Sequence, residues 1–295
     1  MTVCVSVKVS EGLVLAADST AAIVGSLDRS GQSESGILKT YDHVRKLSHI
    51  KDYPIGTLSW GTALVGARSV ESIIKEYEYT LRSLEEEEER IKIRRMRGET
   101  EVEDRVGYSV KEIAGGLGQH FRQFYEKEFS EQPEEEWPPL GILVSGYSAG
   151  EFFPEQWLVD VSGSDELIDI RPDKNGVPQF GAHWFGLTDS IVRLHTGRDD
   201  QALDILSDHF DVPPEEIRDL LKGLEYPVLF DGMPLQDAVD YAVYLVNVTI
   251  GRFRFVVGAP LCGGEIDVAV MTPNAFTWVQ RKAWRAGPSI PGRMV

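Results

Sequence analysis

The chain has 295 residues, of which 30 are Lys or Arg and 47 are Asp or Glu, so its formal net charge is −17. A chain this acidic repels phosphate backbones, which argues against general nucleic-acid binding. Hydrophobic residues make up 42% of the sequence and charged residues 26%, which is the balance of a globular protein with a packed core. The length allows one large domain or two of ordinary size.

The sequence contains no apolar run of about 18 residues, so we expect no membrane-spanning segment. Its first residues lack the basic-then-apolar order of a signal peptide. There are two cysteines, Cys4 and Cys262, too few for a disulfide framework and consistent with a reducing compartment. These features predict a cytoplasmic protein.

The chain opens with two apolar segments separated by a turn. Valine occupies every second position of residues 3–9, which is the period of a strand. Residues 13–17 are continuously apolar, which is typical of a strand buried on both faces. The polar residues 10–12 supply the turn between them. We therefore predict a β-hairpin at the start of the chain.

Residues 25–36 are polar and rich in Gly and Ser, which predicts a loop. Strands are expected over 44–49 and 55–60, and a helix over 62–82. Five glutamates then precede a basic cluster within residues 85–97. That pattern favours a solvated extension of the helix, and a docking surface is the alternative.

The second half of the chain gives a comparable series of elements. A helix is predicted over 109–129, with Ser109 as its N-cap, followed by a break at 131–139. The strand predictions are 140–147, 156–161, 178–187 and 266–272. The helix predictions are 190–196, 200–209, 213–224 and 234–248. Because strands and helices come in groups, we expect two strand layers with helices outside them, an α+β fold with a basic tail.

Residues 146–150 read Gly-Tyr-Ser-Ala-Gly and fit the pattern of a nucleophile elbow around Ser148. Such an elbow needs a helix after the serine, whereas a strand is predicted to follow here. A hairpin turn is therefore the favoured interpretation. A serine hydrolase that pairs Ser148 with His183, His195 or His209 is the alternative. No two histidines have the i, i+4 spacing of a metal-binding helix, so we expect no metal site and no cofactor.

Thr2 follows the initiator methionine and is small enough to permit its removal. The new end would carry a hydroxyl and an α-amine on one residue. An α-amine ionises close to neutral pH and can activate a hydroxyl that is a weak nucleophile on its own. The pattern predicts an N-terminal threonine nucleophile, provided that Met1 is removed.

Two blocks near the start carry a resemblance to a known family. Residues 2–8 and 11–19 resemble the opening of proteasome β-type subunits, where an N-terminal threonine begins a hairpin that ends in Ala-Ala-Asp-Ser. Residues 45–50 and 56–61 resemble the lysine strand of that family and the glycine turn after it. Weaker similarity extends to residues 140–161, 234–248 and 262–264. The chain thus resembles proteasome β-type and HslV-like N-terminal-nucleophile hydrolases, as a divergent bacterial or archaeal homologue.

The resemblance implies a role for several residues. Thr2, Asp18 and Lys46 fall at the catalytic threonine, aspartate and lysine, and the backbone N–H groups of Trp60 and Gly61 would hold the oxyanion. The implied specificity pocket comprises Ala21, Val44, Ser48, Leu58 and Thr62. Candidates for a supporting role are Thr188, Asp189, Ser190 and Cys262. The sequence departs from the family at Ala259, which replaces a supporting aspartate, and at Cys262, which replaces a serine.

The family further implies a four-layer αββα sandwich formed by one domain over residues 1–295. Insertions would lie at about 25–36 and 85–105, with a C-terminal tail after about 273. The implied activity is that of a threonine-type peptidase or amidohydrolase, in a homo-oligomeric ring, acting on a peptide or amide without a cofactor. Whether an ATPase serves the ring is not indicated. Ala259 and Trp60 favour the alternative of an inactive ring or scaffold protein.

Overall fold

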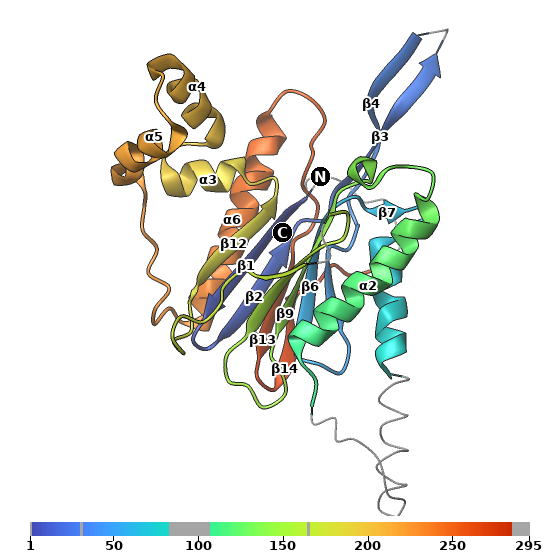
Figure 1. Cartoon of the computed structure of the whole chain (residues 1–295), viewed down its shortest axis with the longest axis vertical. Helices are drawn as coiled ribbons and strands as arrows, with labels where there is room; N and C mark the ends of the chain where they lie inside the picture. The colour runs from blue at the N-terminus through green and yellow to red at the C-terminus, as the bar shows by residue number, and fades with distance from the viewer. Residues whose placement is uncertain (1, 30–31, 83–106, 164–165, 285–295) are drawn as a thin grey trace, which may run out of the picture.

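The computed structural model describes residues 2–29, 32–82, 107–163 and 166–284 (Figure 1). Within these residues the chain has an α+β fold with two five-stranded sheets and helices packed against each. The strand order is β12-β1-β2-β13-β14 in the first sheet and β11-β10-β9-β6-β5 in the second. All pairings in both sheets are antiparallel.

The first sheet contains the predicted opening hairpin. Its strands are β1 (Val3–Val9), β2 (Gly12–Ala17), β12 (Gly181–Gly186), β13 (Asp267–Thr272) and β14 (Ala275–Gln280). Every residue of β1 and β2 is buried, because their valines pack against helix α6 and their other apolar side chains pack against the second sheet. The hairpin register pairs Cys4 with Ala17, so Thr2 and Asp18 lie at the same end of the sheet.

The second sheet is built around the strand pair predicted over 140–161. Its strands are β5 (Leu47–Ile50), β6 (Ile55–Gly61), β9 (Leu140–Gly146), β10 (Glu155–Asp160) and β11 (Leu167–Asp169). Leu58 and Leu143 pair across β6 and β9 and pack with Leu15 of the first sheet. This shared apolar cluster holds the two sheets together, since burying one leucine side chain contributes roughly 1.5–3 kcal/mol.

Two small hairpins lie outside the main sheets. They are formed by β3 (Ala21–Arg29) with β4 (Gln32–Tyr41) and by β7 (Leu64–Val65) with β8 (Arg68–Ser69). The prediction of a loop over 25–36 is therefore wrong, because most of that segment belongs to β3 and β4, which project from the body as an arm (Figure 1). The two strands pair only with each other, outside both main sheets. Because they do not have to bury one face against a core, their polar, Gly-rich sequence lacks the alternation of apolar residues that would predict a strand.

The helices follow the predicted segments closely. They are α2 (Val110–Glu128), α3 (Asp189–Thr196), α4 (Asp200–Phe210), α5 (Pro214–Leu221) and α6 (Leu235–Phe255), with 3-10 turns at Glu134–Glu136 and Lys222–Leu224. Residues 70–82 are also helical, and the short β7–β8 hairpin replaces the first part of the helix predicted there. Helix α6 packs on β1 and β2, and α2 packs on β9 and β10.

Two features of the ends of these elements bear on the predictions. The Ser109 side chain accepts a hydrogen bond from the Glu112 N–H, so the predicted N-cap of α2 is confirmed. The tail predicted after about 273 is wrong at its start, because β14 occupies Ala275–Gln280 and completes the first sheet. The charge run within 85–97 and the insertion at about 85–105 lie outside the described residues. The single-domain boundary over 1–295 stays a prediction.

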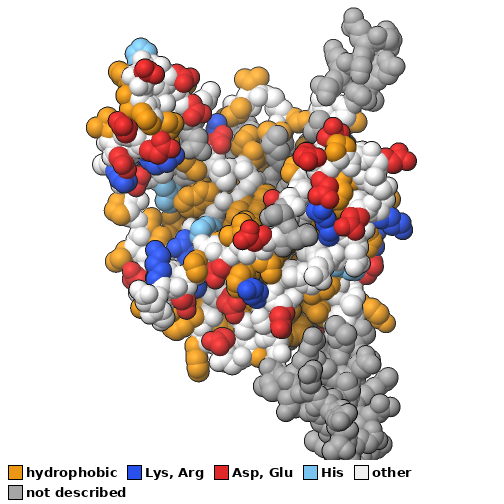
Figure 2. Space-filling view, in the orientation of Figure 1, with side chains coloured by type: hydrophobic (Ala, Val, Ile, Leu, Met, Phe, Trp, Pro, Cys, Tyr) orange, Lys and Arg blue, Asp and Glu red, His pale blue; other side chains and the backbone are white. Residues whose placement is uncertain are grey.

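Acidic side chains are spread over the face seen in Figure 2, interspersed with lysine and arginine. Acidic side chains of the described residues also form ion pairs, such as those of Glu134 with Arg122 and of Asp52 with Arg82. Among the helices that the structure describes, none combines the length and the apolar character needed to cross a membrane.

Candidate functional site

Thr2 immediately precedes β1, and little of its surface is exposed. It is 5% exposed and lines a cavity of about 540 Å³, together with Lys46. The Thr2 carbonyl accepts a hydrogen bond of 2.7 Å from the Leu187 N–H, which ties the start of β1 to the end of β12. The residue is thus held by backbone contacts while it still borders a cavity.

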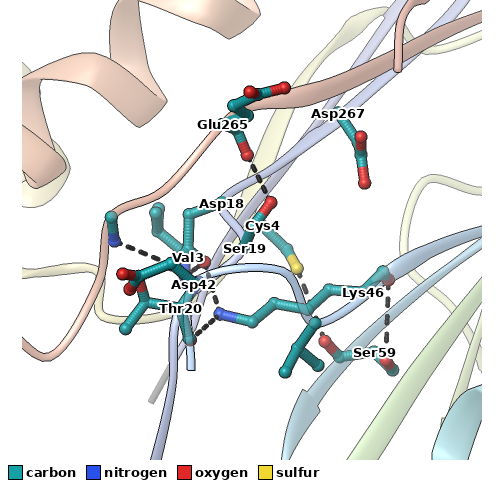
Figure 3. Close-up of polar contacts among 12 residues, drawn as sticks. Val3, Cys4, Asp18, Ser19, Thr20, Asp42, Lys46, Ser59, Glu265 and Asp267 are labelled. Atoms are coloured by element: carbon teal, nitrogen blue, oxygen red, sulfur yellow. Dashed lines mark hydrogen bonds and ion pairs between the residues drawn. The ribbon is translucent and has the colours of Figure 1, made fainter. Parts of the chain in front are cut away.

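Asp18 follows β2 and is fully buried next to Val3, the residue after Thr2 (Figure 3). One carboxylate oxygen accepts hydrogen bonds from the Val3 N–H at 3.0 Å and from Lys46 Nζ at 2.6 Å. The other oxygen accepts from the Thr20 and Gly263 N–H groups at 3.2 and 3.0 Å. Four donors therefore surround a buried carboxylate, which is the arrangement that makes burial of its charge tolerable. Asp18 links the residue after Thr2 directly to Lys46.

Lys46 reaches the site from the segment that leads into β5. Its ammonium donates hydrogen bonds of 2.6 Å to Asp18 Oδ1 and to the Thr20 carbonyl (Figure 3). Its own carbonyl accepts from the Ser59 N–H at 2.9 Å, which joins it to β6. The structure thus gathers Thr2, Asp18 and Lys46 around one end of the first sheet, although they come from three separate segments of the sequence.

The two oxyanion candidates are at the end of β6 and line the same cavity as Thr2. The Trp60 ring stacks on Phe185, with 4.2 Å between the ring centroids, and packs with the apolar cluster between the sheets. Gly61 has a positive φ of 100°, and a Cβ there would lie 2.1 Å from the Pro139 carbonyl oxygen. Only glycine fits this turn, because it alone allows both the positive φ and the close approach of the Pro139 carbonyl to the backbone beside the cavity.

Three of the five expected pocket residues, Ala21, Val44 and Thr62, line the cavity at Thr2. Leu58 does not, because its side chain is fully buried in the cluster between the two sheets. Ser48 instead lines a neighbouring cavity of about 430 Å³. Arg45 and Glu71 border both cavities and form an ion pair of 2.8 Å between them, so the pocket at Thr2 is more polar than expected.

The candidate supporting residues have partners of other kinds. Asp189 and Ser190 both accept long hydrogen bonds, of 3.5 and 3.4 Å, from Arg252 on α6. Thr188 precedes α3 without making a side-chain cap bond. Burial, together with the nearby Asp18 charge, raises the pKa of the Cys262 thiol to about 12, so this thiol stays neutral. Ala259, where the family has a carboxylate, is exposed.

A second buried lysine–aspartate pair lies next to the first and was not predicted from the sequence. Lys282 Nζ donates to Asp267 Oδ2 at 2.5 Å and to Ser19 Oγ at 2.6 Å. Lys282 belongs to the segment expected to be a tail, and no local motif marks it as a site residue. Only the completed fold of the first sheet brings it beside Ser19.

Ser148, the alternative nucleophile, lies in the turn between β9 and β10. Its hydroxyl donates to Glu155 Oε1 at 2.6 Å and accepts from the Val110 N–H at 2.9 Å. The element that follows is a strand, whereas a nucleophile elbow requires a helix. His183 and His195 contact other groups: Arg171 and Tyr241, respectively. Ser148 therefore has the contacts of a turn residue, and its hydroxyl satisfies the N–H of the first residue of α2.

His183 on β12 gives a testable pH dependence of stability. Burial, followed by the neighbouring Arg171 charge, lowers its pKa to about 4, and the Arg171 N–H donates to the ring nitrogen at 2.9 Å. Because the unfolded ring has a pKa of about 6.5, the unfolded state binds more protons between these values. The contribution of His183 is therefore complete above about pH 6.5 and is lost as the pH falls towards 4.

We expect the wild-type chain to lose about 2 kcal/mol more unfolding free energy between pH 7 and pH 4.5 than His183→Gln loses. Glutamine keeps an acceptor for Arg171 but does not titrate. Denaturant unfolding at a series of pH values measures the difference. Parallel pH profiles for the two proteins would show that protonation of His183 is not coupled to folding.

The chain was compared with known proteins. No family model matches it, and no curated protein matches it. Among solved structures, it is similar to an Anbu (ancestral beta-subunit) protein from Yersinia bercovieri, at 14% identity over 95% of this chain and 88% of that chain, with a TM-score of 0.49. It is also similar to a Gly-1 mutant of Anbu from Hyphomicrobium sp. strain MC1, at 14% identity over 96% of this chain and 86% of that chain, with a TM-score of 0.52.

These comparisons correct the resemblance drawn from the sequence. The identification with proteasome β-type and HslV-like subunits is wrong: the structural neighbours are Anbu proteins, and no family model supports membership in the former groups. At 14% identity the likeness to the Hyphomicrobium protein establishes the fold alone. The fold is thus proteasome-like, of the Anbu kind, and function has to be argued from the site.

Proposed function

We propose that this chain is an N-terminal threonine amidohydrolase that acts on a peptide or another amide after removal of Met1. The observation that carries the proposal is the bridge made by Asp18. One oxygen of its carboxylate accepts from both the Val3 N–H and the Lys46 ammonium, so the lysine is fixed beside the residue that follows Thr2. Lys46 also lines the cavity that Thr2 lines, so the pair lies where a substrate could reach it.

In the proposed reaction, Thr2 Oγ attacks the carbonyl carbon of the amide, and the Thr2 α-amine accepts the hydroxyl proton. The tetrahedral oxyanion is held by a backbone N–H of Trp60 or Gly61, which border the same cavity. Collapse breaks the C–N bond, and the leaving amine takes the proton from the α-ammonium. Water then hydrolyses the Thr2 ester, with the same amine as general base.

The Lys46 ammonium contributes through its charge. A fixed positive charge disfavours a second one on the Thr2 amine, which leaves that amine neutral and able to accept a proton. The same charge stabilises the developing alkoxide. Asp18 keeps the ammonium oriented through a contact of 2.6 Å. The Arg45–Glu71 ion pair gives the cavity a polar wall, which favours substrates with a polar group beside the scissile amide.

For the architecture, we propose a single domain with the four-layer αββα arrangement of N-terminal-nucleophile hydrolases, and assembly into a homo-oligomeric ring. The packing of α6 and α2 on different sheets supports the layered arrangement. The likeness in fold to the Hyphomicrobium Anbu protein supports assembly, because Anbu denotes an ancestral beta-subunit.

The proposal is tested by mass spectrometry of the purified full chain, before and after treatment with a β-lactone or epoxyketone probe. We expect loss of Met1, one probe per chain, and a modified peptide that carries the label on Thr2. Retained Met1 would overturn the mechanism, since Thr2 would have no free amine. A label on Ser148 would instead establish the serine hydrolase.

An inactive scaffold is the second candidate, and a specific observation favours it. Asp189 and Ser190 are engaged by Arg252, and Ala259 is exposed and lacks a carboxylate, so the support that the resemblance implied is incomplete. A chain that loses Met1 but takes up neither probe would have this function.

A further inference from the structure

Lys282 lies just after β14 and is almost completely buried. Its ammonium has three hydrogen-bond acceptors: Asp267 Oδ2 at 2.5 Å, Ser19 Oγ at 2.6 Å and the Val44 carbonyl at 2.9 Å. Its backbone N–H also donates to Asp267 Oδ1 at 3.0 Å, so the Asp267 carboxylate binds both the backbone and the ammonium of Lys282. Three donors meeting three acceptors make a fully satisfied buried ammonium.

Two of the three acceptors of Lys282 belong to the segments that carry the proposed catalytic pair. Ser19 immediately follows Asp18, and Val44 lies two residues before Lys46. These segments also meet directly, because the Val44 N–H donates to the Ser19 carbonyl at 2.9 Å. A displacement of the Lys282 ammonium would therefore be felt at Asp18 and at Lys46 together.

The surroundings of Ser19 show that this corner is tightly determined. Its hydroxyl donates to the Glu265 carbonyl (Figure 3) and accepts from Lys282, and its N–H donates to the Gly263 carbonyl at 2.9 Å. Gly263 in turn donates to Asp18. The segment that leads into β13 thus contacts both Asp18 and Ser19, and Lys282 contacts Ser19 as well.

Stability alone is a weak reason for this arrangement. Burial lowers the pKa of Lys282, and the contact with Asp267 only counteracts that effect. A buried ion pair is commonly no more stabilising than well-packed apolar side chains of the same size. A defined geometry of polar contacts, by contrast, is something that apolar packing cannot supply.

We propose that Lys282 is a positioning residue of the Thr2 site, which acts through Ser19 and Val44 to fix Asp18 and Lys46. The inference rests on the proposed function. It gives a residue just after the last strand a role in positioning a site at the opposite end of the sequence. Displacement of reacting groups by about 1 Å can cost about a hundredfold in rate.

The test compares Lys282→Met with wild type, with the probe that labels Thr2. Two quantities are followed: the rate constant for labelling at saturating probe, and the final number of labels per chain. We expect the rate constant to fall by about tenfold to a hundredfold while the final labelling stays at one per chain. A residue that only stabilised the fold would lower the final labelling and leave the rate constant of the folded fraction unchanged.

Three further variants complete the design. Lys282→Arg keeps the charge and the donors, and should recover part of the lost rate. The double variant Lys282→Met with Asp267→Asn removes the uncompensated carboxylate, so it provides a folded protein if the single variant does not fold. It should remain slow, because Ser19 and Val44 still lack their donor. Lys8→Met is the matched control: Lys8 is likewise buried, but it lies near the far end of β1 from Thr2.

The outcomes separate the two proposals. If wild type takes up no label, the proposed function fails and the inference fails with it. If wild type is labelled at Thr2 and both the single and the double variants react at the wild-type rate, the proposed function stands and the role of Lys282 is refuted. A slow Lys8→Met would equally refute it, since burial rather than position would then be the cause.

Discussion

Replacement of Lys46 by methionine is expected to slow labelling of Thr2 by about a thousandfold and to lower the free energy of unfolding by about 3 to 5 kcal/mol. The loss of rate follows from removal of the charge that keeps the Thr2 amine neutral. The loss of stability has a separate cause. Asp18 is fully buried, and without the contact of 2.6 Å to Lys46 its charge is no longer compensated.

The two effects can be separated by a second substitution. The double variant Lys46→Met with Asp18→Asn removes both charges, so it should recover most of the stability while labelling stays slow. Rates are measured with saturating probe, and stabilities by denaturant unfolding. Labelling of the folded Lys46→Met protein at the wild-type rate would exclude Lys46 from the reaction and would leave the Asp18–Lys46 pair with a structural role only.

Local sequence patterns predicted much of the fold because the two sheets have sharply patterned strands. Alternating valines and an apolar run define β1 and β2, and each finds its packing partners in the structure on both faces. The N-cap at Ser109 similarly marks the start of α2. The arm of β3 and β4 could not be predicted in this way, since its strands pair with each other outside both main sheets and need no apolar alternation.

The candidate site shows the same division. Thr2, Asp18 and Lys46 belong to the start of the chain, and their spacing could be compared with a known pattern. Lys282 and Asp267 offer no such signal, because the contact of Lys282 with Ser19 spans 263 residues of sequence. Ser48 and Leu58 were expected at the cavity, yet Leu58 is buried between the sheets and Ser48 lines the neighbouring cavity. Those contacts depend on tertiary packing, which residue spacing does not encode.

Replacement of Gly186 by alanine is expected to slow labelling of Thr2 by about a hundredfold. Gly186 pairs with Val3 at the end of β12 and has a positive φ of 83°. A Cβ at this position would lie 2.0 Å from the Thr2 carbonyl oxygen, far inside any permitted contact. The start of β1 must therefore move, and it would carry Thr2 away from the Asp18–Lys46 pair. The left-handed backbone adds a cost of about 1–2 kcal/mol for an alanine.

Gly150→Ala provides the matched control for this experiment. Gly150 has nearly the same backbone conformation, with φ of 80°, but a Cβ there meets nothing within 4 Å. The variant should lose about 1–2 kcal/mol of unfolding free energy through the strained backbone, and it should keep the wild-type rate of labelling. The comparison therefore isolates the displacement of Thr2 from backbone strain. Equal labelling rates for the two variants would mean that the contact between Gly186 and the Thr2 carbonyl does not set the position of the nucleophile.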